Sequence, residues 1–246
     1  MPKKEEEDDD DISDIVSDEE AEEDEEESND LNKADIVTKY RTAGTIANEV
    51  VAAVVAAIKP GIKAVELCAL GDNLIDEACS KIYNKKPKGD EKKVEKGSAF
   101  PTCISVNNCV GHYSPLVTED KVVLEAGDVI KVDLGVHVDG YIAVVAHTVM
   151  CGGIAEGPKG DVIQCAWQAA ELAQRMFKDG ATNTEITDMI AKVADSYKCT
   201  PVEGVLSHQM KKHVIDANKV PPAPSLSAPL ATSRPAACGA ERAVRG

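Results

Sequence analysis

The sequence predicts a mixed α/β fold of the α+β kind, because two helical patterns precede a group of strand patterns and two more helical patterns follow. Apolar residues recur with a helical period over residues 36–58. Further along, Asp139-Gly140 joins two apolar stretches in the manner of a β-hairpin. We therefore expect one folded domain over residues 31–220, between an N-terminal tail (1–30) and a C-terminal tail (221–246).

Two helices are expected before the strands. The first is long and amphipathic over 36–58, and the segment 59–61 (Lys-Pro-Gly) ends it, since Pro and Gly are the strongest helix breakers. The second helix follows at about residues 65–83. Residues 84–97 then lack any periodicity and are rich in Lys and Gly, which predicts an exposed loop.

Six lysines make this loop a candidate phosphate-binding surface: Lys85, Lys86, Lys88, Lys92, Lys93 and Lys96. Lysines clustered on one exposed segment are a feature of nucleic-acid-binding proteins. A solvated surface loop has the same composition and is the simpler interpretation. The sequence leaves both interpretations open.

A short strand is expected around residues 102–106, followed by a hairpin over residues 130–148. If Asp139-Gly140 forms a two-residue turn, the register of the two strands is fixed. The opposed pairs on one face are then Val138 with Tyr141, Val136 with Ala143, Leu134 with Val145, and Val132 with His147. This face is mostly apolar and is expected to face the core.

The other face of the hairpin holds Asp133, which is unusual because strand interiors disfavour Asp. On this face Asp133, Gly135 and His137 lie opposite Ala146, Val144 and Ile142. Val144 is thus diagonal to Asp133, within reach of its side chain. Two explanations stay open: a metal ligand, which needs further ligands nearby, or a structural carboxylate hydrogen-bonded to backbone or a histidine.

The histidines that could accompany Asp133 carry weak signals by themselves. His112 follows an Asn-Asn turn, and His208 lies five residues before His213, close to helical spacing but without the Glu of a His-Glu-x-x-His motif. A lone histidine is more often a packed residue than a ligand.

Two more helices are expected after the hairpin, at about 160–178 and 179–197, with Thr184 as a candidate N-cap of the second. From about residue 221 the chain becomes rich in Ala and Pro and loses all periodicity. This segment is expected to be disordered, either as a natural tail or as the product of a frameshift or an alternative exon.

The N-terminal tail contains eighteen Asp or Glu and two Lys, which accounts for the whole formal net charge of −16. Such a segment is expected to stay disordered and to act as a solubilising tail or as an acidic arm for basic proteins.

No signal peptide and no membrane-spanning run are visible, so we expect no membrane partner. Eight cysteines without a Cys-x-x-Cys pair predict buried, reduced thiols, and no cofactor is expected.

Three separated motifs resemble one family in the right order: "FPTCISVNNCVGHYSP", "GDVIKVDLGVHVDGYIAVVAHT" and "TPVEGVLSHQMKKHVID". They resemble the pita-bread fold of type 2 methionine aminopeptidases (peptidase M24), and in particular its non-peptidase branch, the proliferation-associated (ErbB-binding) proteins. The resemblance runs from about Ile36 to Val220. It implies a pita-bread domain, of which this chain is expected to hold only the N-terminal part, truncated at its C-terminal end.

The resemblance also implies a dismantled metal site. Active members of the family bind two metal ions through two Asp, one His and two Glu, with a further His near the substrate. Carried over, the first Asp is Asp133 and the second falls eleven positions later on Val144. The substrate-side His corresponds to His112 and the ligand His to His208, and no segment matches the two Glu. We therefore expect no metal, no catalytic residue and a vestigial pocket of His112, Asp133, Val144 and His208.

For function, the resemblance implies a non-enzymatic factor that binds RNA, ribosomes or ribonucleoprotein, and regulatory proteins. It implies roles in ribosome biogenesis, translation, transcriptional co-regulation and growth, in the cytoplasm, nucleus and nucleolus. The alternatives are a metal-dependent methionine aminopeptidase and a truncated isoform with little autonomous function. The oligomeric state is not predicted.

Overall fold

The computed structural model describes residues 29–85, 93–118, 121–202 and 207–217. The tails predicted at 1–30 and 221–246 therefore lie outside the described residues, except for residues 29 and 30. Within those ranges, no helix is long and apolar enough to cross a lipid bilayer.

Two helices open the fold, as the sequence predicts. Helix α2 spans Ala34–Ala57, and α3 spans Ala64–Ser80. Pro60 and Gly61 separate them, and the N–H of Gly61 donates to the carbonyl of Leu124 (2.8 Å). The junction is thus tied to the segment that leads into the sheet.

An antiparallel sheet follows, in the order β1-β2-β3: β1 (Lys96–Val106), β2 (Val129–Val138) and β3 (Tyr141–Met150). Strand β1 is longer than the predicted 102–106, because it continues beyond two register shifts between Ser98 and Cys103. As a result, Lys96 lies at the start of a strand rather than in a loop, and its ammonium group donates to Asn84 Oδ1 (2.9 Å).

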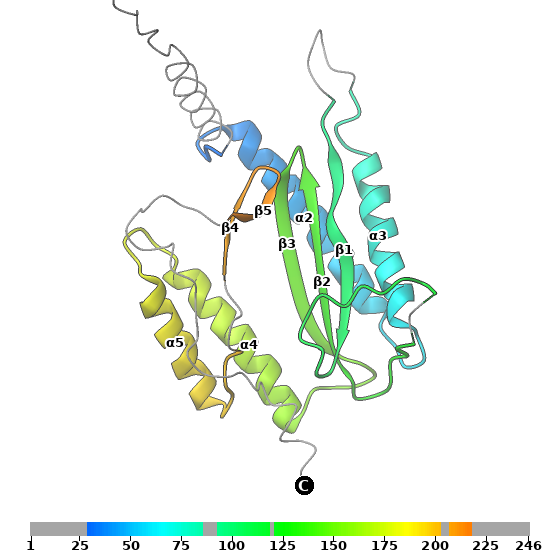
Figure 1. Ribbon diagram of the computed structural model, residues 1–246, viewed down its shortest axis with the longest axis vertical. Coiled ribbons are helices and arrows are strands. Elements are labelled where there is room, and N and C mark those ends of the chain that lie inside the picture. The colour runs from blue at the N-terminus through cyan, green and yellow to red at the C-terminus, as the bar shows by residue number, and fades with distance from the viewer. Residues whose placement is uncertain (1–28, 86–92, 119–120, 203–206, 218–246) are drawn as a thin grey trace, which may run out of the picture.

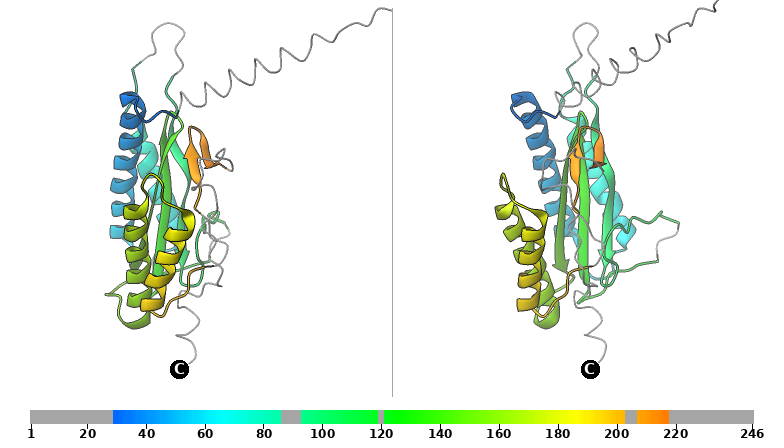
Figure 2. Two further views of the ribbon diagram at one scale, coloured as in Figure 1. Left: turned by 90° about the vertical axis from the view of Figure 1, so that its left-hand side faces the viewer. Right: turned by 60° about the vertical axis from the view of Figure 1, so that its left-hand side comes forward.

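The core lies between the two helices and one face of the sheet (Figures 1 and 2). Helix α2 packs on β2 and β3, while α3 packs on β1. The predicted core face is confirmed: Val132, Leu134, Val136 and Val138 are fully buried. His147 was expected in the same core but is exposed, because β3 is an edge strand of this sheet and its residues are less covered than those of the central strand β2.

Helices α4 (Gly157–Met176) and α5 (Asn183–Ser196) pack on each other beside the β3 side of the sheet (Figure 1). The N-cap of α5 is Thr182 and not the predicted Thr184. Its hydroxyl accepts from the N–H of Glu185 (3.3 Å), and the Glu185 carboxylate accepts from the N–H of Thr182 (3.1 Å). This reciprocal capping box outcompetes Thr184, which has no acidic partner three residues on.

A small hairpin of β4 (Gln209–Lys211) and β5 (Val214–Ala217) lies next to the start of β3 (Figure 1). His208 and His213 are therefore not on a helix: His208 precedes β4, and His213 lies in the hairpin turn with a φ of 60°. The N–H of His213 donates to the carbonyl of Gly140 (2.9 Å), which joins this hairpin to the turn between β2 and β3.

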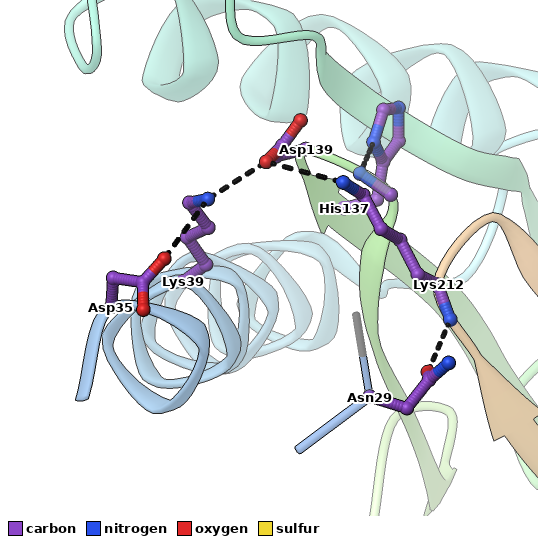
Figure 3. Close-up of polar contacts among 7 residues, drawn as sticks. Asn29, Asp35, Lys39, His137, Asp139 and Lys212 are labelled. Carbon is purple, nitrogen blue, oxygen red and sulfur yellow. Dashed lines mark hydrogen bonds and ion pairs between the residues drawn. The ribbon is translucent and has the colours of Figure 1, made fainter. Parts of the chain in front are cut away.

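The turn at Asp139-Gly140 has positive φ at both residues (54° and 79°), as a two-residue primed hairpin turn requires. Figure 3 shows how charged groups hold it. The Asp139 carboxylate lies 2.7 Å from the Lys39 ammonium group and 3.7 Å from that of Lys212. Burial by itself lowers the pKa of Lys39, but the hydrogen bond to Asp139 and the charges of Asp139 and Asp35 together outweigh it and raise that pKa. This anchoring fixes the register that positions the site described below.

His137 makes the same turn sensitive to acid. Its Nδ1 accepts from the N–H of Gly140 (3.3 Å). Burial lowers the pKa of His137, and His213 lowers it further, while Glu95 and Asp139 partly oppose this. At pH values between the lowered pKa of folded His137 and the ordinary pKa of histidine, the unfolded state binds more protons than the folded state. His137 therefore contributes stability at neutral pH that is lost as the pH falls.

We expect the stability difference between wild type and His137→Asn to depend on pH. Asn keeps an acceptor near the Nδ1 position but does not titrate. In urea unfolding at about pH 7.5 and about pH 5, the wild type should lose more free energy of unfolding than the variant on acidification. An equal loss in both proteins would contradict a depressed pKa at His137.

Candidate functional site

The candidate site lies on the sheet face opposite the two N-terminal helices, and the hairpin register positions it. The register predicted from the Asp139-Gly140 turn is confirmed along the whole hairpin, with Val138 opposite Tyr141. Asp133 pairs with Ala146 on β3, and Gly135 pairs with Val144. Val144 is thus diagonal to Asp133 on the same face, and it is 47% exposed.

His112 lies beside Asp133, as the sequence suggested. Its Nδ1 is 3.9 Å from Asp133 Oδ2, which is too long for a hydrogen bond but close enough for an ion pair when the imidazole is protonated. The His112 side chain is 91% exposed, whereas that of Asp133 is 25% exposed. Among the described residues, the Asp133 carboxylate accepts no hydrogen bond, so the structure does not show the hydrogen-bonded structural carboxylate that was one of the two open explanations.

Sequence reasoning missed Cys103, which completes this cluster. Cys103 pairs directly with Asp133 across β1 and β2. The ligand atoms of Cys103, His112 and Asp133 all lie within 4.8 Å of one another. No local signal marks Cys103, because its position next to Asp133 depends on how β1 pairs with β2, and a long connection (residues 107–128) joins those two strands.

Burial makes ionisation costly in this cluster. It raises the pKa of Asp133, and the nearby His112 only partly opposes this. Burial also raises the pKa of the Cys103 thiol to about 11, and the Asp133 carboxylate adds to the rise. In the absence of a cation, the thiol is therefore protonated at neutral pH and is not a nucleophile.

The remaining predicted site residues lie elsewhere. His208 is exposed ahead of β4 and does not belong to the cluster of possible metal ligands found among the described residues. Of the six loop lysines, Lys85 and Lys93 are exposed, and Lys96 starts β1. Lys86, Lys88 and Lys92 lie outside the described residues.

Comparison with known protein families shows which family this chain belongs to. The profile of metallopeptidase family M24 matches residues 38–233, which is most of the chain. The chain belongs to metallopeptidase family M24.

Several curated M24 relatives are similar to this chain. "ERBB-3 binding protein 1" of Arabidopsis thaliana is 50% identical over 77% of this chain and 47% of its own length. "Proliferation-associated protein A" of Dictyostelium discoideum is 44% identical over 78% of this chain and 49% of its own length. "Curved DNA-binding protein" of Schizosaccharomyces pombe is 42% identical over 77% of this chain and 49% of its own length. The chain spans about half the length of these relatives.

Solved structures confirm the M24 pita-bread fold. A thermophilic Arx1 superposes with a TM-score of 0.66 at 26% identity, covering 75% of this chain and 55% of that one. Methionine aminopeptidase from Rickettsia prowazekii gives a TM-score of 0.60 at 22% identity, covering 77% and 71%. The mixed α/β architecture described here therefore covers part of the pita-bread fold.

The described residues do not fit the two-metal centre that family M24 implies. Two divalent ions a few ångströms apart need several carboxylates to offset their repulsion and to bridge them. Val144 offers only hydrocarbon at the position diagonal to Asp133, so it cannot coordinate a metal. Asp133 is then the only carboxylate in the cluster of possible ligands that the described residues form.

Proposed function

We propose that this chain is a non-enzymatic M24 protein that works by binding RNA or ribonucleoprotein and regulatory proteins. The observation that carries the proposal is Val144: the confirmed register places it diagonal to Asp133, where a second metal-binding carboxylate would be needed. Two relatives are named for binding, "ERBB-3 binding protein 1" and "Curved DNA-binding protein", which supports a binding role.

We expect no methionine aminopeptidase activity. Full-length chain loaded with Co²⁺ or Mn²⁺ should release no methionine from a short Met-Ala peptide beyond the same buffer and metal alone, because a single carboxylate cannot assemble two ions. An active M24 methionine aminopeptidase assayed in parallel serves as the positive control. Metal-dependent release that disappears in Asp133→Ala would overturn the non-enzymatic proposal.

The nucleic-acid part of the proposal rests on the lysines between α3 and β1. Lys85 and Lys93 are exposed at the two ends of the segment that joins these elements. Because the formal charge of residues 31–246 sums to zero, this basic segment stands out against an electrostatically balanced domain. Exposed lysines contact phosphates without reading sequence.

We expect single-stranded RNA to bind with an affinity that falls with salt and depends on these lysines. Each lysine that neutralises a phosphate contributes about 0.7 to the slope of log K against log salt. Lys85→Gln combined with Lys93→Gln should reduce the slope by about one to two, measured by fluorescence anisotropy at several salt concentrations. The matched control is Lys178→Gln with Lys192→Gln, an equal charge change on exposed positions of the α4–α5 region.

Equal effects of the two double variants would show that net charge, and not this segment, governs binding. An affinity that does not change with salt concentration would exclude phosphate contacts altogether.

We further propose roles in ribosome biogenesis, translation and growth regulation, in the cytoplasm, nucleus and nucleolus, following the resemblance to the proliferation-associated proteins. Pull-down of ribosomal particles by the full chain, with and without nuclease, tests whether such contacts run through RNA.

A further inference from the structure

Three side chains of different chemistry converge on the open face of the sheet: a thiol, an imidazole and a carboxylate. Cys103 comes from β1, Asp133 from β2 and His112 from the segment after β1. Their ligand atoms lie within 4.8 Å of one another. This set differs from the M24 ligand set, which uses neither a thiol nor the substrate-side histidine.

The sheet itself holds two of the three groups. Cys103 and Asp133 are directly opposed residues of neighbouring antiparallel strands, and such side chains lie on the same face at close range. Cys103 is 5% exposed, and its Sγ–H donates to the carbonyl of Pro101 (3.2 Å). These two donors are therefore fixed relative to each other by the backbone.

His112 is held next to Cys103 and Asp133 by a segment whose backbone is strained and is hydrogen-bonded to β1. The N–H of Ile104 donates to the carbonyl of Tyr113 (2.8 Å), and the N–H of Tyr113 donates to Ser105 Oγ (3.2 Å). His112, immediately before Tyr113, has a φ of 62°. Positive φ is uncommon outside glycine and costs energy, and such strain clusters at ligand sites.

The chemistry of the three donors selects the ion. A thiolate and an imidazole suit zinc, whereas Mg²⁺ and Ca²⁺ require oxygen ligands. Zinc bonds of about 2.0–2.3 Å place the ligand atoms of a tetrahedral site roughly 3.5 Å from one another, so donors that lie within 4.8 Å need to approach by at most roughly 1.3 Å. His112, whose side chain is almost fully exposed, is free to make most of that movement.

We propose that Cys103, His112 and Asp133 bind a single zinc ion, in place of the two-metal centre of the M24 enzymes. On binding, the Sγ–H bond of Cys103 breaks, the Sγ–Zn bond forms, and the proton passes to the buffer. The thiolate and the carboxylate together neutralise the charge of the ion, which a partly buried site requires. The ion ties the segment that carries His112 to the sheet, and the site does not depend on RNA binding.

Cobalt(II) chloride is the spectroscopic probe, added to the chelator-treated full chain with a non-thiol reductant present. We expect one cobalt ion per chain, a thiolate-to-cobalt charge-transfer band in the near ultraviolet, and displacement of the cobalt by added zinc. Cys103→Ser should lose the charge-transfer band. His112→Ala should keep the band but weaken cobalt binding by at least about tenfold. Mutation of residues that only hydrogen-bond to a metal ligand already lowers metal affinity by about this factor.

Two variants serve as matched controls. Cys109→Ser removes a neighbouring thiol, and His208→Ala removes the histidine that the M24 pattern assigns to the metal; both should bind cobalt like the wild type. A charge-transfer band that survives in Cys103→Ser, two ions per chain, or a loss in His208→Ala equal to that in His112→Ala would overturn the proposal. Because His112 is on the surface, its substitution tests the site without disturbing the core, which far-ultraviolet circular dichroism verifies.

Discussion

Leu134→Ala is expected to lower the free energy of unfolding by about 2–5 kcal/mol, the usual range for emptying a fully buried leucine position. Leu134 has no exposed surface, and it lies on the sheet face that packs against the N-terminal helices. Removing its side chain leaves a cavity between layers that the backbone of β2, paired on both sides, cannot close. Urea unfolding at constant pH, with the denaturant dependence checked for change, provides the measurement.

Val144→Ala is the matched control on the other face of the same hairpin. Since Val144 is 47% exposed, its truncation should change the free energy of unfolding by no more than about 0.5 kcal/mol. A one-residue slip of β3 against β2 would instead place Val144 on the same face as Leu134, so both truncations would then have similar effects. Similar effects would therefore remove Val144 from the position diagonal to Asp133, and with it the main support for the non-enzymatic proposal.

The hairpin register could be predicted because local chemistry determines it. Asp139-Gly140 is one of the few dipeptides that adopt positive φ at both positions easily, and a two-residue turn leaves one possible pairing of the flanking strands. The N-terminal helices were equally predictable, because Pro60 and Gly61 end a pattern that repeats every three or four residues. In both cases the determining residues are adjacent in the sequence.

The rest of the candidate site depends on contacts between distant segments. Cys103 and Asp133 are thirty residues apart, and nothing near Cys103 in the sequence predicts the register of β1 against β2 that places it opposite Asp133. The conformation of His112 is set by hydrogen bonds of Tyr113 to β1, which no motif encodes. Likewise, His208 and His213 suggested helical spacing, but Lys212 and His213 form a hairpin turn that is anchored by Asn29 and Gly140.

Substitution of two helix glycines by alanine should have opposite effects on stability. In an exposed helix, Gly→Ala stabilises by about 1 kcal/mol. At Gly44 of α2, an added Cβ would meet Ala143 Cβ at 3.9 Å, an ordinary contact, so that gain should be realised. At Gly71 of α3, the Cβ would lie 2.5 Å from Thr102 Oγ1 and 2.7 Å from its Cγ2.

Gly71→Ala is therefore expected to destabilise the protein by about 1–3 kcal/mol, the cost of overpacking a core. Thr102 cannot easily move away, because it is fully buried and its N–H donates to Asp72 Oδ1 (2.8 Å), one residue along from Gly71. Thr102→Ala should restore part of the loss, with a coupling energy of about 0.5–3 kcal/mol in a double-mutant cycle. If Gly71→Ala stabilises the protein as Gly44→Ala does, α3 does not press on β1 at this point, and the strand that carries Cys103 is not held against its helix.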